Sequence, residues 1–423
     1  MDIIFHGGAR EVGRSCIEIK DNGSSKRVIL DCGIKVHEHG IDHPTTISDM
    51  ENIDALFLSH AHLDHTGSLP LFDHMGMKCP IFCTPVTKSI TKTLLDDSFH
   101  IQLLKHKHPA YSEFDIDDVM KRMRLVDYRK KGTYSGIDYE FFDAGHIPGS
   151  ASILLEIGGK RILYTGDFNT VKTRLLSGAD TTYNNIDVMI TESTYGDCDH
   201  PSRKKEENSF IQSIKSILAG NGSVLIPVFS LGRAQEIALL LSDYEFPAKI
   251  YMDGMARKIT RICTNAKRFE SSDILRQAMK KIKMVNDRDE RERIIFSKGI
   301  FLSTSGMLNG GPVLSYLNKL WHNPRSGILM TGYQANGTNG RMLLESERAY
   351  VDGMQIHFDG PIKKYDFSAH SGKNNIVNLV KKIRPKNLII NHGDHGAMIE
   401  LENSVKGIVE NVFVPEADQL LKI

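Results

Sequence analysis

Short apolar runs, each ending at glycine or a polar residue, recur along the chain. Such runs are typical of strands that are covered on both faces of a sheet. Helical spacing separates many of them, because apolar residues follow the i, i+3, i+4, i+7 rule over residues 237–244 and 376–383. We therefore predict an α/β fold. The predicted strands include residues 27–31, 55–58, 139–142, 161–165, 187–191, 223–227, 299–302, 327–331 and 387–391.

Length and composition are those of an ordinary globular protein. The chain has 423 residues, of which 25% are charged and 40% hydrophobic, so it can form two or three domains with a substantial core. These values exclude a disordered, collagen-like or disulfide-stapled chain. No apolar run approaches the roughly 20 residues that span a bilayer, and the six cysteines form no CxxC pair. We expect a cytoplasmic protein with no membrane segment.

The formal net charge of +1 conceals three blocks of opposite sign. Residues 31–75 hold 8 Asp/Glu and one Lys, a balance of −7. Residues 253–298 hold 13 Lys/Arg and 7 Asp/Glu, and residues 363–386 hold 7 Lys/Arg and one Asp, so each has a balance of +6. Any one block could be a solvated helix face. Together they indicate an acidic, metal-binding region with a basic path for a polyanion beside it.

The sharpest local feature is the run of three histidines and an aspartate directly after the predicted strand 55–58. His60, His62, Asp64 and His65 lie within six residues. Burying these groups without partners would be costly. Neutral imidazole together with carboxylate suits zinc, with manganese as the alternative if oxygen ligands dominate. We interpret this run as a metal-binding loop.

Further ligand candidates follow other predicted strands. His146 lies in a Gly/Pro turn after residues 139–142, Asp167 follows residues 161–165, and His392 follows residues 387–391. Functional loops of α/β proteins gather at strand ends, so we expect these side chains to meet the histidine run. Asp31, at the end of the strand 27–31, is the candidate for orienting a ligand imidazole by a hydrogen bond.

This combination of HxHxDH with an upstream Asp and a downstream His and Asp resembles the metallo-β-lactamase superfamily. Residues 191–196 (TESTYG), 367–372 (FSAHSG) and 391–393 (NHG) look like motifs A, B and C of the β-CASP nucleases. Residues 227–235, 303–312 and 332–341 are similar to the cleavage and polyadenylation specificity factor (CPSF) branch of that group, which is related to RNase J. The resemblance implies an αββα metallo-β-lactamase sandwich, residues 1–195 and 346–423, with an α/β β-CASP cap, residues 196–345, inserted in it.

The resemblance also implies residue roles. One zinc would be held by His60, His62 and His146, the other by Asp64, His65 and His392, with Asp167 bridging the two. His370 would protonate the leaving 3′ oxygen and Glu192 would orient it, while Asp64 would belong to the catalytic set as well. The expected products are a 3′-hydroxyl and a 5′-phosphate.

Several other residues are candidates for gripping RNA. The glycine-rich run after the strand 299–302, with Ser303, Ser305 and Gly306, resembles a phosphate-binding nest. The cationic candidates in the cap are Arg233, Lys258 and Arg341. For the two arginines, the alternative is that they form structural ion pairs. Ser368 and Ser371 precede a predicted helix over residues 373–383, where they could bind phosphate, cap the helix, or do both.

Six further histidines are predicted not to bind metal. His37, His39 and His43 lie in a loop with no strand to aim them, and His100, His106 and His108 fall in or beyond a predicted helix near residues 87–104. We predict surface or substrate-loop positions for them.

The leading hypothesis is a zinc-dependent ribonuclease of RNA processing or decay that cuts single-stranded RNA internally, with or without an additional 5′→3′ exonuclease activity. The first alternative is a processive 5′→3′ exoribonuclease resembling RNase J. A DNA-acting relative is disfavoured because such members typically carry valine where this chain has His392. An inactive scaffold subunit is disfavoured because every ligand position is filled. We expect two Zn²⁺ (or Mn²⁺) per chain, a homodimer, and membership in an RNA-processing complex.

Overall fold

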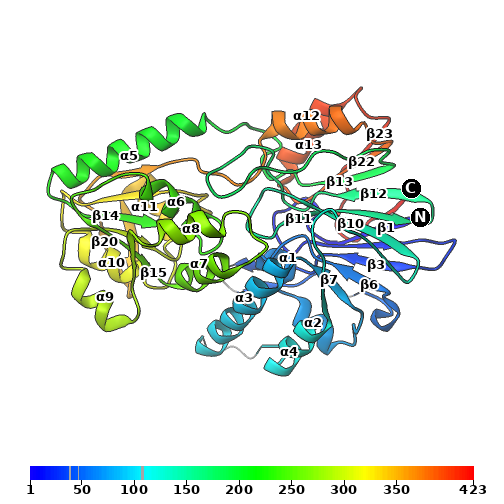
Figure 1. Cartoon of the computed structure of the whole chain (residues 1–423), viewed down its shortest axis with the longest axis horizontal. Coiled ribbons are helices and arrows are strands. Elements are labelled where there is room, and N and C mark those ends of the chain that lie inside the picture. The colour runs from blue at the N-terminus through cyan, green and yellow to red at the C-terminus, as the bar shows by residue number, and fades with distance from the viewer. Residues whose placement is uncertain (38–39, 46, 106–108) are drawn as a thin grey trace. The chain divides into compact units, whose positions relative to one another are not determined.

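A computed structural model describes residues 1–37, 40–45, 47–105 and 109–423 (Figure 1). The chain forms two compact units. The first comprises Met1–Lys172, Ser177–Asp199 and His370–Ile423, and the second comprises Thr173–Leu176 and His200–Ala369. Both contain helices and strands, which confirms the predicted α/β class. Over the described ranges, no helix is both long enough and apolar enough to pass through a membrane.

Two seven-stranded mixed sheets form the centre of the first unit. Their strand orders are β24-β1-β2-β3-β6-β7-β8 and β23-β22-β13-β12-β11-β10-β9. The strands of the first sheet are β1 Asp2–Gly7, β2 Cys16–Lys20, β3 Arg27–Leu30, β6 Ala55–Phe57, β7 Ile81–Cys83, β8 Met123–Leu125 and β24 Leu420–Lys422. Those of the second are β9 Lys131–Tyr134, β10 Ile137–Asp143, β11 Ala151–Ile157, β12 Lys160–Tyr164, β13 Val188–Thr191, β22 Asn387–Ile390 and β23 Asn411–Phe413.

The two sheets pack face to face through one apolar cluster. Phe57 and Val28 of the first sheet belong to this cluster together with Phe141 and Ile153 of the second. Because successive strand residues point to opposite faces, Leu154 lies instead in the cluster on the other side of β11. The alternation leaves an apolar outer face on each sheet that only another layer can cover.

Helices cover those outer faces, so that the unit is the four-layer αββα sandwich that was predicted. Ile376 of α12 and Met398 of α13 pack against the second sheet. Phe72 of α2 and Val119 of α4 pack against the first, and Leu95 of α3 packs with α4. These elements are α2 Leu69–His74, α3 Pro85–Leu104, α4 Glu113–Arg122, α12 Lys373–Ile383 and α13 His395–Val405. The short elements β4 Lys35–His37, β5 Gly40–Asp42, η1 Met50–Asn52 and α1 Leu63–Thr66 lie in the loops.

The second unit has a six-stranded sheet of order β16-β15-β17-β14-β18-β21, in which every neighbouring pair is parallel. Its strands β14, β17 and β18 are buried throughout and almost entirely apolar, as expected when both faces are covered, whereas the edge strand β21 carries two lysines. They are β14 Val224–Pro227, β15 Lys249–Asp253, β16 Ile282–Met284, β17 Gly299–Ser303, β18 Gly327–Met330 and β21 Ile362–Lys364.

A separate apolar cluster covers each face of this sheet. Phe210 and Ile237 contribute to one, and Tyr316 and Leu343 to the other. The result is a three-layer αβα arrangement. Its helices are α5 Arg203–Ala219, α6 Arg233–Ser242, α7 Met255–Asn265, α8 Ser272–Ala278, α9 Arg288–Ile294, α10 Val313–Leu320 and α11 Asn339–Ser346, and its hairpin is β19 Arg348–Val351 with β20 Met354–His357.

The second unit ends later in the chain than residue 345, where the sequence analysis put the boundary. Residues up to Ala369 belong to it, because β21 pairs in parallel with β18 at the edge of the six-stranded sheet and Phe367 enters its apolar cluster. The start at His200 lies close to the predicted residue 196.

A four-residue segment from earlier in the chain, Thr173–Leu176, also belongs to the second unit. The buried carboxylate of Glu236 accepts the backbone N–H groups of Arg174 and Leu175, at 3.2 and 2.8 Å. The hydroxyl of Ser271 donates to the carbonyl oxygen of Leu175 at 2.5 Å. The segment is therefore held by its backbone and by the buried Leu175 side chain.

Candidate metal centre and active site

The candidate site of the first unit is built at strand ends. His60 follows β6, His146 follows β10, Asp167 follows β12, Glu192 follows β13 and His392 follows β22. Neighbours β12, β13 and β22 are parallel, so their carboxyl ends meet at one edge of the second sheet. The sequence analysis expected this gathering of strand ends.

The short helix α1 aims the remaining ligand candidates. It carries Asp64 and His65, and His62 is its N-cap residue. The backbone N–H of Ser15 donates to the carbonyl oxygen of Asp64 at 2.8 Å, which ties the helix to the neighbouring loop. A Cβ atom on Gly33 would lie 1.6 Å from the Asp64 carbonyl oxygen, so this close approach requires glycine.

One group of ligand atoms comprises His60, His62, His146 and Asp167, all within 4.8 Å of one another. The Nδ1 atom of His62 lies 3.1 Å from His60 Nε2 and 3.3 Å from His146 Nε2. Two nitrogens bound to one tetrahedral zinc would be about 3.3 Å apart. The spacing of the three imidazoles therefore suits a single metal ion.

A second group comprises Asp64, His65, Asp167 and His392. His65 Nε2 lies 3.4 Å from Asp167 Oδ2, and Asp64 Oδ2 lies 3.8 Å from His65 Nε2 and 3.6 Å from His392 Nε2. His392 Nδ1 lies 3.1 Å from Asp167 Oδ1. Asp167 belongs to both groups, which is the position required of a residue that binds two metals.

The donor set fits a metal on the evidence of its own unsatisfied atoms. His65 Nε2, His392 Nδ1 and Asp167 Oδ1 are buried and make no well-aligned hydrogen bond, although His392 Nδ1 and Asp167 Oδ1 face each other at 3.1 Å. Buried polar atoms without partners are rare in folded proteins and need an explanation. Five imidazoles and two carboxylates around these atoms are the ligand chemistry of zinc, so a bound metal would satisfy them.

The pKa values of histidines in the two ligand groups are shifted in opposite directions. Burial, reinforced by the neighbouring histidine rings, lowers the pKa of His60, and burial lowers that of His62 as well. Both stay neutral, the state that binds metal. Burial also acts to lower the pKa of His392, but Asp167 outweighs it and raises this pKa to about 10. Metal binding at the second group therefore displaces a proton.

A histidine–glutamate pair lies beside the metal ligands. His370 Nδ1 is 2.9 Å from Glu192 Oε2 and 4.0 Å from Asp167 Oδ2. Glu192 is 2% exposed and also accepts the backbone N–H of Phe168 at 2.8 Å. Burial acts to lower the pKa of His370, but the Glu192 carboxylate outweighs it and raises this pKa. A protonated imidazole is thereby stabilised next to the metal site.

Comparison with known proteins decides which fold family has this site. Three family models match: a beta-lactamase superfamily domain over residues 26–219, a Beta-Casp domain over residues 234–343, and a Zn-dependent metallo-hydrolase RNA specificity domain over residues 356–415. The chain is 42% identical over 411 residues to the "Probable RNase MJ4" of Methanocaldococcus jannaschii, covering 95% of each chain.

The chain belongs to the β-CASP ribonucleases of the metallo-β-lactamase superfamily. Two further relatives agree. An "RNase J-like protein" of M. jannaschii is 36% identical over 99% of each chain, and the "RNase aCSPSF2" of Saccharolobus solfataricus is 33% identical over 99% of this chain and 84% of that one. The resemblance drawn from the motifs is thus confirmed, and the protein is a metal-dependent hydrolase.

Within this β-CASP ribonuclease, the structure brings all seven predicted ligands together in the two overlapping groups described above. It also places Asp31 against His65, with Asp31 Oδ2 2.7 Å from His65 Nδ1. The sequence analysis missed Ser59 and Tyr164, whose hydroxyls also contact Asp31. The one feature of the sequence that could have indicated them is their position next to predicted ligands, since Ser59 precedes His60 and Tyr164 ends the strand before Asp167.

The serines before α12 do not cap it. The N-cap residue is Gly372, without a side-chain hydrogen bond, and Asp199 Oδ1 instead accepts the backbone N–H of Asn374 at 2.9 Å. Ser371 is fully buried and its hydroxyl accepts the N–H of Thr170 at 3.2 Å. Ser368 is part-buried in the second unit. The capping interpretation was wrong because a residue distant in sequence supplies the cap.

The candidate RNA-binding residues of the β-CASP unit lie in the loops and helices that follow its parallel strands. Ser303 is buried at the end of β17, and Ser305 and Gly306 continue from it. Lys258 is exposed on α7. Arg341 forms an ion pair with Glu345 one turn along α11, Nε to Oε1 2.5 Å, as the structural alternative proposed. Arg233 begins α6.

The histidines predicted not to bind metal lie elsewhere, as far as the described ranges reach. His37 Nε2 contacts Asp42 at the surface, and His43 Nδ1 donates to Ser68 Oγ at 2.7 Å. His100 is exposed on α3. His39, His106 and His108 lie outside the described residues.

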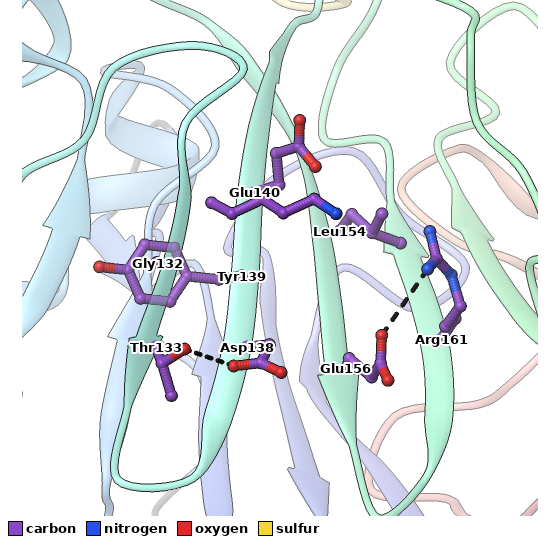
Figure 2. Close-up of a pocket in the computed structure, with 9 residues that line it drawn as sticks. Gly132, Thr133, Asp138, Tyr139, Glu140, Leu154, Glu156 and Arg161 are labelled. Carbon is purple, nitrogen blue, oxygen red and sulfur yellow. Dashed lines mark hydrogen bonds and ion pairs between the residues drawn. The ribbon is translucent and has the colours of Figure 1, made fainter.

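A shallow surface groove crosses strands β9 to β12 (Figure 2). Three carboxylates and two cations line it, with Glu156 paired to Arg161 and Asp138 accepting a hydrogen bond from the hydroxyl of Thr133. None of the predicted ligands or catalytic residues lines this groove. Its mixed charge does not suit a polyanionic strand, so we assign it no part in the chemistry.

Proposed function

We propose that this protein is a two-zinc ribonuclease that cuts single-stranded RNA internally, leaves 3′-hydroxyl and 5′-phosphate ends, and also degrades RNA in the 5′→3′ direction. One observation carries the proposal: the His370–Glu192 pair lies beside two overlapping ligand groups that share Asp167. Two metal groups joined by one carboxylate are suited to in-line displacement at a phosphate, where attacking and leaving oxygens both need stabilisation.

In this proposal, the attacking water is activated by zinc, and residues of the chain supply the proton for the leaving group. Bound zinc would lower the pKa of the attacking water and offset the charge that grows on the phosphate. The protonated His370 ring is held beside the metal ligands by Glu192, and we assign it the transfer of a proton to the departing 3′ oxygen. Glu192 orients the ring and, by raising its pKa, keeps the acid form populated near neutral pH. Asp64 contributes to catalysis as a metal ligand of the second group.

RNA binding is assigned to residues of the β-CASP unit and of the segment before α12. Lys258 is exposed and supplies a phosphate contact, and Ser303, Ser305 and Gly306 supply the loop whose backbone N–H groups donate hydrogen bonds to a phosphate. Arg233 and Arg341 are the guanidinium candidates; for Arg341 the pair with Glu345 must open. Ser368 remains a phosphate candidate, whereas the buried Ser371 is better suited to holding Thr170.

A processive 5′→3′ exoribonuclease is the second candidate function. It is favoured by the likeness to the "RNase J-like protein", which extends over 99% of both chains. The two candidates differ in whether cleavage requires a free 5′ end, which a direct experiment distinguishes.

The test uses one labelled RNA sequence in three forms: 5′-monophosphorylated, 5′-triphosphorylated and circular. An endonuclease cuts the circle and gives the same internal sites on all three forms. Cleavage of the 5′-monophosphorylated form alone, releasing mononucleotides, would replace the proposal by the exonuclease alternative. Absence of RNA cleavage by a chain that carries two zinc ions would overturn both.

A further inference from the structure

The carboxylate of Asp31 collects four hydrogen bonds inside the first unit. Asp31 Oδ1 accepts the backbone N–H of Ser59 at 2.7 Å. Asp31 Oδ2 accepts from Ser59 Oγ at 2.6 Å, from His65 Nδ1 at 2.7 Å and from the hydroxyl of Tyr164 at 2.7 Å. Asp31 and His65 are 0% exposed and Tyr164 is 4% exposed, so water does not compete for these bonds.

This one carboxylate controls a histidine in each ligand group. His65 donates its Nδ1 hydrogen to Asp31, which leaves Nε2 free to face Asp167 at 3.4 Å. Ser59 gives its hydroxyl hydrogen to Asp31, so the same oxygen accepts from His60 Nδ1 at 2.9 Å. That bond leaves His60 Nε2 without a hydrogen atom of its own, and this nitrogen lies 3.1 Å from His62 Nδ1. Which ring nitrogen of a histidine binds metal is set by the hydrogen bond of the other.

The position of the Tyr164 hydroxyl is explained by its hydrogen bond to the Asp31 carboxylate. Its ring belongs to the apolar cluster between the two sheets, where phenylalanine would pack equally well. The hydroxyl nevertheless points to Asp31, with Ser15 Oγ on its other side at 3.2 Å. The turn after Tyr164 closes directly on Ser59, because a Cβ atom on Gly166 would lie 2.5 Å from the Ser59 Cβ.

We propose that Tyr164 and Ser59 are positioning residues of the metal centre, which act through Asp31 to hold His60 and His65 with their Nε2 atoms presented to metal. Tyr164 restrains the carboxylate of Asp31 by its hydrogen bond. Ser59, which donates to Asp31 and accepts from His60, extends this restraint to the first ligand group. The proposal rests on the two-zinc centre of the proposed function and adds the residues that preorganise it. Loss of such supporting hydrogen bonds typically weakens metal binding about 10- to 100-fold.

The test measures zinc affinity of the full chain by competition with a chromophoric chelator. Tyr164→Phe removes only the hydroxyl, and we expect zinc to bind about tenfold more weakly. Ser59→Ala removes a donor to Asp31 and the acceptor of His60, so we expect a loss nearer 100-fold. Tyr183→Phe is the matched control, because Tyr183 is a buried tyrosine of the same unit outside the centre and should leave the affinity unchanged.

Two further readouts separate positioning from a loss of folding. The cobalt-substituted Tyr164→Phe chain should show shifted visible absorption bands, whereas the Tyr183→Phe chain should match the wild type. In the zinc-loaded wild type, nitrogen NMR should find His60 and His65 protonated at Nδ1, a measurement that needs no variant. Either ring protonated at Nε2, or wild-type zinc affinity and cobalt bands in Tyr164→Phe, would overturn the proposal.

These outcomes are independent of the proposed ribonuclease activity. If the wild type binds zinc but cleaves no RNA, the proposed function fails and the positioning roles are still decided by the affinities. If the wild type cleaves RNA and the Tyr164→Phe and Ser59→Ala chains bind zinc as tightly as it does, the positioning roles fail and the proposed function stands.

Discussion

Replacement of His370 by alanine removes a proton donor without removing a ligand from either metal group. General acid catalysis typically contributes 10²- to 10⁴-fold, so we expect kcat to fall by that factor, about 3–5 kcal/mol of transition-state stabilisation. The substitution also leaves the Glu192 carboxylate, 2% exposed, with the Phe168 N–H at 2.8 Å but without its imidazole partner. That should cost about 1–3 kcal/mol of unfolding free energy.

The assay compares two substrates under single-turnover conditions, with zinc content measured in parallel. One is an ordinary RNA, and the other carries sulfur in place of the 3′ oxygen at the cleaved bond. A thiolate leaves without needing a proton, so the His370→Ala chain should recover most of the lost rate on the sulfur substrate. It should retain as much zinc as the wild type.

A matched control is available in the second unit. His200 Nδ1 lies 2.9 Å from Asp366 Oδ2, and its side chain is 21% exposed, as is that of His370 in its 2.9 Å pair with Glu192. His200→Ala should therefore remove a histidine–carboxylate contact of the same length, to a carboxylate side chain that is 32% rather than 1% exposed, without slowing cleavage of either substrate. Equal slowing of the His370→Ala chain on both substrates would refute the acid role, and loss of zinc would make His370 a ligand, as the third group of Asp167, Glu192 and His370 would allow.

Three other changes have distinct expected results. Asp167→Ala should lose zinc from both groups together with activity, and elemental analysis showing unchanged metal would contradict the shared role. Glu192→Gln removes the charge that raises the pKa of His370, so the basic limb of the kcat–pH profile should move to lower pH; an unmoved limb would separate Glu192 from the acid. Phe57→Ala should lower the free energy of unfolding by about 3–5 kcal/mol in urea titrations, since Phe57 is 0% exposed between the two sheets; a loss below 1 kcal/mol would contradict its core position.

The ligand groups could be predicted from sequence because their positions depend on local structure. His60, Asp167 and His392 each follow a short apolar run, and the runs are strands whose carboxyl ends meet. The α/β class followed from the same runs. The arrangement of the two sheets came instead from the family resemblance, since periodicity does not reveal which strands share a sheet.

Features that depend on contacts between distant residues could not be predicted. Tyr164 lies 133 residues from Asp31 in the chain, and nothing near either residue indicates that the two hydrogen-bond. The cap of α12 comes from Asp199, 175 residues before Asn374. The pairing of β21 with the six-stranded sheet was not predicted, because β21 is a three-residue strand with an intermediate-to-exposed pattern, too short for periodicity to identify.

Because the segment Thr173–Leu176 belongs to the β-CASP unit, this unit is not one continuous stretch of chain and cannot be exchanged by joining sequences at two positions. Removing residues 200–369 would take away Glu236 and Ser271, which hydrogen-bond to the backbone of Leu175, and leave Arg174 without Glu207, its partner at 2.8 Å. Expressing those residues alone would leave the buried Glu236 without the two backbone N–H groups it accepts. A chimaera that transplants this region from one relative to another must therefore carry residues 173–176 with it, and grafts that ignore them should be insoluble or proteolysed.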